Sequence, residues 1–430
     1  MLPEEQNERL TRVGRGTPMG ELLRRYWIPV LLSEDLPGPD SDPVRITLLG
    51  ERLVAFRDTS GRVGLIDRLC AHRCADLFFG RNEEDGLRCT YHGWKYDVQG
   101  NCVDMPTEDE DSNFANKVQL TAYPCREAGG TVWTYMGPKA LEPALPEFEF
   151  NHVPETHRFV SWNVQECNFV QAIEGGIDSA HSAFLHSTLD SHKMNEAWRE
   201  QGRRSGNLRD LYHARDKHPK FFARDTDYGV MVGSRRNTGE DKYYWRYNLF
   251  LMPFYTTPPS SPKQKSFHAF VPLDDVTCAR WSFTYHLETP LSAQLVAQYR
   301  TGGGLHAALV PGSFHIPTRN KSNDYLIDRQ EQRTLTFTGI KGTGEQDFSV
   351  QEGMGTIVDR SRERLGVTDI GIIAMRRRLF KESTDLLEGT EPYSAGHGDV
   401  YRLHAGDALL PTDAQWDEDP EVKKALAATW

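Results

Sequence analysis

Short apolar runs alternate with turn residues between residues 44 and 101. The stretch VRITLLGERLVAFRDTSGRVGLIDRL predicts three strands, with chain reversals at residues 50–51 and 58–61. CTYHGWKYDVQGNCVDMP continues the pattern, and its turn falls at residues 99–101. This pattern indicates a small antiparallel β-domain with loops that protrude from the strand ends.

A proline-rich stretch at residues 137–155 predicts the boundary to a second region. Alternating aromatic residues there indicate strands at residues 228–236, 243–257, 265–273 and 278–288. Helical patterns lie at residues 164–189, 349–366 and 371–389. We therefore expect an α+β fold. An all-β domain would occupy residues 1–150, with its core at about 44–136, and an antiparallel sheet flanked by helices would occupy residues 151–430.

Composition narrows the classes of function. The chain has 430 residues and a net charge of −11, which argues against a nucleic-acid surface, because such a surface needs clustered positive charge. No run approaches the roughly 18 apolar residues that span a bilayer, and the polar start lacks the apolar centre of a signal peptide. We expect a cytoplasmic protein that acts on neither nucleic acid nor membranes. The seven scattered cysteines do not suit a disulfide framework.

The most specific chemical signal is Cys70-x-His72, followed after sixteen residues by Cys89-x-x-His92. Two occupants accept such donors: tetrahedral zinc, or a two-iron, two-sulfide cluster in which two cysteines hold one iron and two histidines the other. Zinc sites usually pair Cys with Cys and His with His. Here each loop offers one Cys and one His, so that each loop can reach both irons of a cluster. The order of residues favours the iron–sulfur cluster.

A second group of potential ligands is Asp178-x-x-His181-x4-His186. On a regular helix the two histidines would lie about 140° apart, so the helix must end or carry a π-type irregularity near residues 182–185. Two histidines and a carboxylate form the facial triad of non-haem iron(II) oxygenases. Without other evidence, His181 and His186 would be interpreted as two ordinary histidines of a helix. The upstream cluster motif changes this interpretation, because an electron source in the same chain gives an iron site a purpose.

Together, the two motifs resemble those of the oxygenase component of Rieske non-haem iron aromatic oxygenases. The segments TRVGRGTPMGELLRRYWIPVLL, YHGWKYD and SNDYLIDRQ resemble the phthalate dioxygenase-like branch. The resemblance implies an N-terminal Rieske domain and a C-terminal catalytic domain of helix-grip, START-like fold. It differs at two positions beside the first cysteine, where this chain has Ala71 and Cys74 in place of the usual Pro and Gly.

Carried over residue by residue, the resemblance makes Cys70, His72, Cys89 and His92 the ligands of one Rieske 2Fe-2S cluster. His181 and His186 would hold one mononuclear Fe(II), with Asp347 as the third ligand by position; Asp324, Asp328 and Glu352 are the alternatives for that third place. Asp178 would be an electron bridge between His181 and a cluster histidine of a neighbouring subunit. A homotrimer, or a hexamer of trimers, would supply that neighbour.

The implied reaction uses O2 to hydroxylate, dihydroxylate or O-demethylate an aromatic acid. Because the chain has no dinucleotide fingerprint, electrons would come from a separate NAD(P)H-dependent flavin reductase. A substrate carboxylate calls for an arginine. Arg246 and Arg209 are the candidates, and Arg204, Arg235 and Arg236 lie in the same region. Two other functions stay open at this point: a non-catalytic Rieske electron carrier, and a zinc-bound structural protein.

Overall fold

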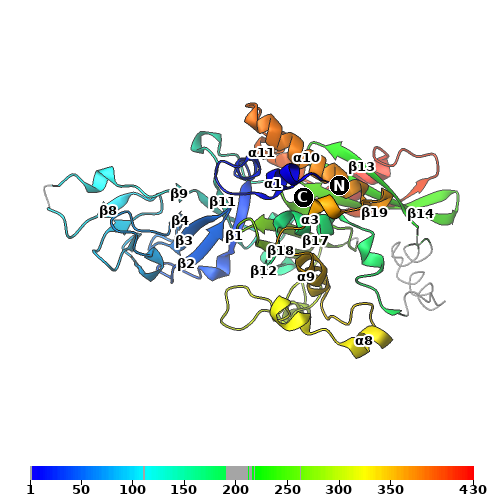
Figure 1. The fold of residues 1–430 in the computed structure, drawn as a ribbon, viewed down its shortest axis with the longest axis horizontal. Helices are drawn as coiled ribbons and strands as arrows, with labels where there is room; N and C mark the ends of the chain where they lie inside the picture. The colour runs from blue at the N-terminus through cyan, green and yellow to red at the C-terminus, as the bar shows by residue number, and fades with distance from the viewer. Residues whose placement is uncertain (1, 110–111, 190–211, 213–215, 217, 262) are drawn as a thin grey trace.

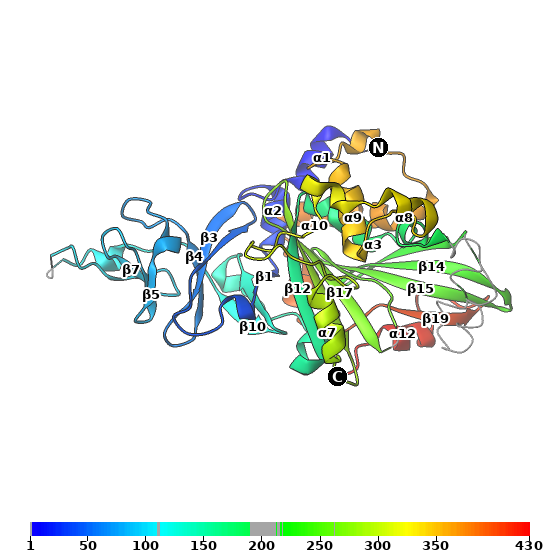
Figure 2. The ribbon, with the colours of Figure 1, turned by 90° about the horizontal axis from the view of Figure 1, so that it is seen from below.

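The computed structural model describes residues 2–109, 112–189, 212, 216, 218–261 and 263–430. The molecule is elongated and has two lobes (Figures 1 and 2). One end is all-β, and the other holds a large sheet with helices around it. The α+β class expected from the hydrophobic pattern is therefore confirmed, including the order of its two parts.

Three small antiparallel sheets build the first lobe. The first sheet contains β1 (Trp27–Leu32), β10 (Cys125–Ala128) and β11 (Thr131–Tyr135). The second contains β2 (Val44–Leu48), β3 (Glu51–Arg57), β4 (Val63–Asp67) and β9 (Ala122–Tyr123). The third contains β5 (Arg81–Glu83), β6 (Gly86–Arg88), β7 (Lys95–Tyr96) and β8 (Cys102–Asp104), and it lies farthest from the second lobe (Figure 1).

Strand β3 separates two hydrophobic cores. Successive side chains of a strand point to opposite faces of its sheet. Leu53 and Ala55 belong to the large core shared with the second lobe, whereas Val54 and Phe56 belong to a smaller core. The smaller core also contains Cys70 and Cys89 and their neighbours, so the loops that carry both cysteines rest on packed side chains.

An eight-stranded antiparallel sheet forms the second lobe. Its strands run in the order β12 (Arg158–Gln165), β18 (Cys278–His286), β17 (Gln264–Pro272), β16 (Tyr255–Thr257), β15 (Lys242–Leu251), β14 (Gly229–Glu240) and β13 (Lys220–Thr226). Strand β19 (Gly406–Pro411) pairs with the first half of β15, along the edge where β16 pairs with its last residues. Strands are present in all four segments predicted from alternating aromatics, but the single strand expected at residues 243–257 is wrong: this segment contains β15 and β16, which pair antiparallel with each other.

Within the described ranges, the α-helices are α1 (Glu4–Thr11), α2 (Pro18–Leu23), α3 (Phe169–Ile177), α7 (Ala293–Arg300), α8 (Arg329–Thr334), α9 (Thr343–Gly353), α10 (Ile370–Leu387), α11 (Tyr393–Gly396) and α12 (Pro420–Leu426). Helix α3 packs on β16 and β17 and also touches α9, whereas α10 covers β13 and β14. The helix expected at residues 371–389 is present as α10. The other two differ in extent, since α9 begins six residues before the predicted start at 349, and α3 is much shorter than residues 164–189.

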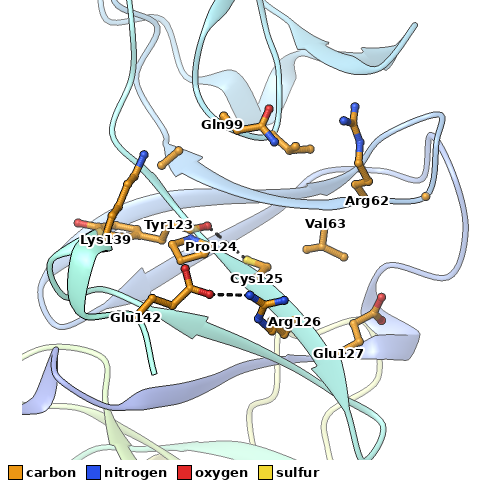
Figure 3. A pocket seen from close by; sticks show the side chains of 13 residues that line it. Arg62, Val63, Gln99, Tyr123, Pro124, Cys125, Arg126, Glu127, Lys139 and Glu142 are labelled. Carbon is orange, nitrogen blue, oxygen red and sulfur yellow. Dashed lines mark hydrogen bonds and ion pairs between the residues drawn. The ribbon is translucent and has the colours of Figure 1, made fainter. Parts of the chain in front are cut away.

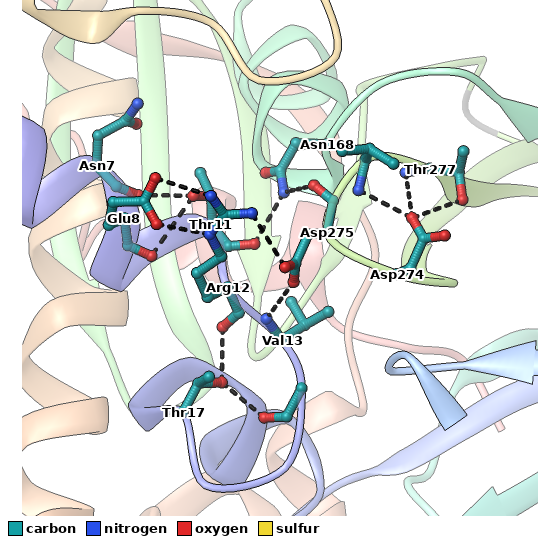
Figure 4. Close-up of polar contacts among 12 residues, drawn as sticks. Asn7, Glu8, Thr11, Arg12, Val13, Thr17, Asn168, Asp274, Asp275 and Thr277 are labelled. Atoms are coloured by element: carbon teal, nitrogen blue, oxygen red, sulfur yellow. Dashed lines mark hydrogen bonds and ion pairs between the residues drawn. The ribbon is translucent and has the colours of Figure 1, made fainter. Parts of the chain in front are cut away.

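A polar junction fixes the start of α3 (Figure 4). The side-chain Oδ1 of Asn168 caps the helix by accepting a hydrogen bond from the Val170 N–H at 3.1 Å. Its amide donates to the carbonyls of Thr11, at 2.9 Å, and Asp275, at 2.7 Å. One buried side chain thus joins the N-terminal segment, helix α3 and the β17–β18 turn.

Among the described residues, no helix is both long enough and apolar enough to cross a membrane. The cytoplasmic location stays a prediction.

Candidate metal centres and substrate cavity

Two loops of matching geometry carry the Cys-His motifs. The N–H of Cys74 donates to the Cys70 carbonyl at 2.9 Å, and the N–H of Gly93 donates to the Cys89 carbonyl at 3.0 Å. The N–H groups of Cys70 and Cys89 donate to residues 75 and 94, at 2.9 and 2.8 Å. Each loop is therefore closed by the same two backbone hydrogen bonds, and each carries one cysteine and one histidine.

The side chains of these loops suit a metal cluster. The two cysteines are buried, and the rings of His72 and His92 lie 4.3 Å apart between centroids. Trp94 stacks on His72 at 4.6 Å, and the His72 Nδ1 is a buried nitrogen without a hydrogen-bond partner among the described residues. A buried unpaired ring nitrogen is costly, and a metal bond would satisfy it.

Tyr96 lies under the first loop. Its hydroxyl accepts a hydrogen bond from the Ala71 N–H at 3.2 Å and lies 3.3 Å from the Cys70 Sγ. Because the oxygen already accepts from the backbone, its own proton is available to the sulfur. Hydrogen bonds to cluster sulfurs help set the reduction potential, so Tyr96 belongs to the group of residues that would tune a bound cluster.

In the second lobe, Asp178 ends helix α3 and begins the turn that carries His181. Its carboxylate accepts hydrogen bonds from the N–H groups of Ala180, at 2.7 Å, and His181, at 3.3 Å. The same carboxylate lies 3.4 Å from the His181 Nδ1. Burial alone would lower the pKa of His181, but the nearby Asp178 and Asp347 outweigh burial and raise it. A short 3₁₀ helix, His181–Ala183, then leads toward His186.

His181, His186 and Asp347 come together. Their ligand atoms all lie within 4.8 Å of one another, which among the described residues is true of no other group of three or more His, Cys, Asp or Glu side chains. The Nε2 atoms of the two histidines are 3.2 Å apart, and the Asp347 Oδ1 lies 3.2 Å from His186 and 3.6 Å from His181. Two imidazole nitrogens and a carboxylate oxygen at this spacing fit a divalent metal.

Gln346 orients His186, and sequence reasoning did not find it. Its amide donates to the Ile340 carbonyl at 2.8 Å, which leaves Oε1 to accept from the His186 Nδ1 at 2.7 Å. The proton then sits on Nδ1, and the Nε2 lone pair faces His181 and Asp347. The sequence feature that could have pointed to Gln346 is its position next to Asp347, a potential metal ligand.

The three alternative carboxylates have other roles. Asp328 caps α8 by accepting from the N–H groups of Gln330 and Glu331, and Asp324 is exposed in a 3₁₀ segment. Glu352 accepts from the Tyr325 hydroxyl and from the Glu166 N–H. None of the three joins the histidine pair.

A cavity of about 390 Å³ opens beside the three side chains. Its lining is rich in polar groups, which include Arg246, Asn248, Ser266, His268 and Arg280. Burial and the neighbouring Arg280 lower the pKa of His268 well below its ordinary value, so this ring stays neutral. The cavity combines a potential metal site with room for a small ring and a cationic wall.

The candidate arginines divide into three groups. Arg246 borders the cavity, and its Nη2 donates to the Pro259 carbonyl at 3.1 Å. Arg235 and Arg236 do not border the cavity. Arg235 lies over the Tyr243 ring at 4.1 Å, and Arg236 donates a hydrogen bond to the Ser234 hydroxyl at 3.3 Å. Arg204 and Arg209 lie outside the described residues. Arg280, on β18, borders the cavity and was not among the candidates.

A larger cavity, of about 550 Å³, lies in the first lobe between β4, β10 and the segment at residues 139–142 (Figure 3). Its two acidic side chains are already paired, Glu142 with Arg126 and Glu127 with Arg57, each at 2.8 Å. It contains none of the potential ligands, so the chemistry belongs to the smaller cavity.

Two glycines allow α3 to approach α9 and the sheet closely. A Cβ at Gly175 would meet the Gln351 Nε2 at 2.0 Å, and a Cβ at Gly176 would meet the Phe270 ring at 2.7 Å. The Gly-Gly pair just before Asp178 was therefore a sequence signal of close packing by α3 against α9 and β17.

Comparison with known proteins matches both lobes. Residues 26–124 match the family described as Rieske [2Fe-2S] domain, and residues 134–427 match the one described as LigXa C-terminal domain like. Two relatives are 36% identical: the 3-chlorobenzoate-3,4-dioxygenase oxygenase subunit of Comamonas testosteroni, over 96% of this chain and 96% of the relative, and the phthalate 4,5-dioxygenase oxygenase subunit of Pseudomonas putida, over 97% and 94%. The 5,5'-dehydrodivanillate O-demethylase oxygenase subunit of a Sphingobium species is 34% identical over 91% and 83%.

Solved structures share the fold at low identity. Dicamba monooxygenase bound to 3,6-dichlorosalicylic acid is 16% identical and covers 85% of this chain and 98% of its own, with a TM-score of 0.58. An NdmA mutant of Pseudomonas putida CBB5 with caffeine is 18% identical and covers 93% and 99%, with a TM-score of 0.59. The observed pairing of a small β-lobe with a large helix-flanked sheet is thus a known architecture.

Proposed function

We propose a substrate and a subunit arrangement for this protein. The chain belongs to the Rieske non-haem iron aromatic oxygenases and is an oxygenase component of the phthalate dioxygenase-like branch. As such it is an oxidoreductase with a Rieske cluster, a mononuclear iron and O2 as co-substrate, and it receives electrons from a separate partner. The zinc alternative is excluded by this membership. The proposed substrate is an aromatic carboxylate, oxidised by hydroxylation, dihydroxylation or O-demethylation.

One observation carries the substrate proposal: the three potential iron ligands border a cavity whose wall contains two arginines, Arg246 and Arg280. Arginine binds carboxylates through two parallel hydrogen bonds. The relatives named above are named for chlorobenzoate, phthalate and dehydrodivanillate. We keep Arg246 and Arg209 as proposed substrate-binding residues.

In the proposed assignment, Cys70 and Cys89 hold one iron of the cluster, and His72 and His92 hold the other. His181, His186 and Asp347 hold the mononuclear iron. When bound, the cluster supplies single electrons and the iron supplies a centre for reductive activation of O2. The chain's own contribution is orientation: Gln346 and Asp178 fix the two imidazole rings so that each turns its Nε2 toward the metal position.

The arrangement of the lobes supports transfer between subunits. The sheet β5–β8, next to the cluster loops, lies at one end of the molecule, whereas α3 and α9 lie in the other lobe (Figures 1 and 2). Asp178 is partly exposed, with 21% of its side chain accessible, so a second protein surface can reach it. We propose that Asp178 connects His181 with a cluster histidine, His92, of a neighbouring copy in a trimer or a hexamer of trimers.

Two further parts of the proposal concern organisation. The domains would comprise residues 1–150 and 151–430, since the three small sheets fall within the first range and the eight-stranded sheet within the second. The electron partner would be a flavin reductase that oxidises NAD(P)H.

The test combines metal analysis with substrate oxidation. The purified chain should contain, per copy, the two irons and two labile sulfides of a Rieske cluster and one additional iron. With an artificial reductase, O2 uptake should rise on addition of a phthalate, a methoxybenzoate or a biphenyl carboxylate, and product analysis should separate dihydroxylation from demethylation. A non-catalytic carrier would take up O2 at the same rate with and without each acid, and that result would overturn the proposal.

A further inference from the structure

Arg280 is a buried cation that forms no ion pair with any residue that the structure describes. The residue is 3% exposed, and its Nη1 donates to the Leu305 carbonyl at 2.9 Å. The guanidinium also lies over the Phe348 ring at 5.3 Å. Among the described residues, no carboxylate comes within the 4.0 Å of an ion pair with it. Burial lowers the pKa of Arg280 below its ordinary value, and the charges of Asp347 and Glu345 offset only part of that effect. A buried charge of this kind is unfavourable unless it is paired.

Strand register shows how Arg280 differs from Arg246. Arg246 on β15 lies directly opposite Asp407 on β19, so an acidic residue flanks it in the sheet. Arg280 on β18 lies opposite Asn163 on β12 and Phe270 on β17, both of which are uncharged. Cross-strand neighbours of opposite charge stabilise one another, and Arg280 has no such neighbour.

The surroundings hold Arg280 in place at the cavity. A Cβ at Gly344, the second residue of α9, would meet the Arg280 Nη1 at 2.8 Å, so the absence of a side chain there makes room for the guanidinium. The Leu305 carbonyl accepts hydrogen bonds from both Arg280 and Ser282, at 2.9 and 3.1 Å. His268 borders the same cavity, and its Nδ1 lies 3.3 Å from the Trp281 carbonyl, which can only accept. Burial and the neighbouring Arg280 lower the pKa of His268 well below its ordinary value, so this ring adds no second charge beside the guanidinium.

From this geometry we infer that Arg280 binds the carboxylate of the substrate and so selects aromatic acids over their neutral analogues. The inference rests on the proposed function and adds to it a specificity-determining residue. A substrate carboxylate in the cavity would supply the counter-charge that the sheet lacks. A charged hydrogen bond in a buried site is strong, and Arg offers the two parallel donors that a carboxylate accepts.

The test measures binding to the metal-loaded enzyme by isothermal titration calorimetry. Phthalate, 3-methoxybenzoate and biphenyl-2-carboxylate are titrated first, and the acid that binds most tightly is then compared with its primary amide. Arg280→Met keeps the length of the stem and removes the charge. We expect the acid to bind on the order of 10- to 100-fold more weakly to this variant, while the amide binds as it does to the unchanged protein. Arg280→Lys should recover part of the acid affinity.

Two further variants separate binding from structure. Gly344→Ala should push the guanidinium aside without disturbing the helix, because alanine is the better helix former, and it should weaken acid binding while the amide is unaffected. Arg300→Met removes an exposed arginine of α7 and should change nothing. Iron content and thermal unfolding are recorded for every variant.

The outcomes are distinguishable. If an acid binds and Arg280→Met weakens the acid and the amide equally, Arg280 has a structural role only and the inference is wrong, whereas the proposed function stands. Unchanged acid affinity in Arg280→Met would also show that the inference is wrong and would leave the proposed function standing. If no acid of the panel binds to the unchanged enzyme, the proposed substrate class fails, and the inference fails with it.

Discussion

At the scale of single residues, Cys74 occupies the position in the first cluster loop that Gly93 occupies in the second. Both residues have positive φ angles, 56° and 78°. Glycine adopts this conformation without strain, whereas a side chain in it costs about 1–2 kcal/mol. A Cβ at Gly93 would also meet the Pro106 ring at 2.6 Å. This comparison explains why glycine is usual at the position where this chain has cysteine.

Cys74→Gly should therefore stabilise the first lobe. We expect a gain of up to about 1 kcal/mol, since part of the relieved strain is offset by the greater freedom of glycine in the unfolded chain. The measurement is thermal unfolding, with the visible spectrum of the cluster as a check on the loop. Cys125→Ala, outside the loops, is the control for loss of a thiol. A lower midpoint in Cys74→Gly would show that the thiol itself supports the loop.

Asp178→Asn should separate electron transfer from metal binding. Asparagine keeps the shape and an accepting oxygen, so the turn to His181 can persist, but the negative charge beside His181 is lost. We expect the cluster spectrum and the iron content to be retained and turnover to fall by about 10- to 100-fold or more. Asp328→Asn, an exposed cap of α8, is the control. Normal substrate oxidation by Asp178→Asn would rule out the bridging role.

The residues that sequence reasoning found differ in kind from those it missed. The Cys-His pairs and the Asp178–His186 segment are local patterns with fixed spacing, so the chain displays them directly. Arg280 lies inside CARWSFTYH, where alternation looks the same whether a side chain faces a core or a cavity. Its role depends on α9 and the Leu305 loop, which are distant in sequence. The contact of Gln346 with His186 joins residues 160 positions apart, so only its place beside Asp347 pointed to it.

At the scale of elements, the two ends of helix α3 show which sequence signals predict a helix boundary and which do not. The expected helix began at residue 164, but β12 extends to Gln165 because it pairs with β18 along its whole length. Asn168 then caps α3. An Asn at this position is a sequence signal for the start of a helix, but the helical pattern that extends to residue 164 hid it. The helix ends at Ile177, and no Gly or Pro follows it; the Asp178 carboxylate accepts hydrogen bonds from the N–H groups of the next turn instead. That ending could not be read from composition.

Asn168→Ala should weaken the junction of α3 with the rest of the molecule. The substitution removes a helix cap and leaves the buried carbonyls of Thr11 and Asp275 without their donor. We expect a loss of roughly 2–4 kcal/mol in the free energy of unfolding. Ser292→Ala removes only the cap of α7 and should cost about 1 kcal/mol. Equal midpoints for the two variants would show that Asn168 acts as a cap alone.

At the scale of the whole molecule, the order of the two lobes was predictable, but their spatial relation was not. The two metal motifs are about a hundred residues apart in sequence, and the fold places their elements in different lobes (Figure 1). Packing of β1, β2 and β3 against the second lobe fixes this separation, since one hydrophobic core spans both. A long-range core of this kind has no local signature. The separation makes the neighbouring copy part of the proposed electron path.

The most direct test of that path is a mixed assembly of two inactive variants. Cys70→Ser with Cys89→Ser removes the cluster, and His181→Ala with His186→Ala removes the mononuclear iron. The two are co-expressed with different tags, purified through both, and assayed for substrate oxidation. The account predicts that the mixed assembly regains turnover that neither variant has alone, because a cluster in one copy reduces the iron of another. Inactive mixed assemblies in which each variant keeps its remaining metal centre would contradict it.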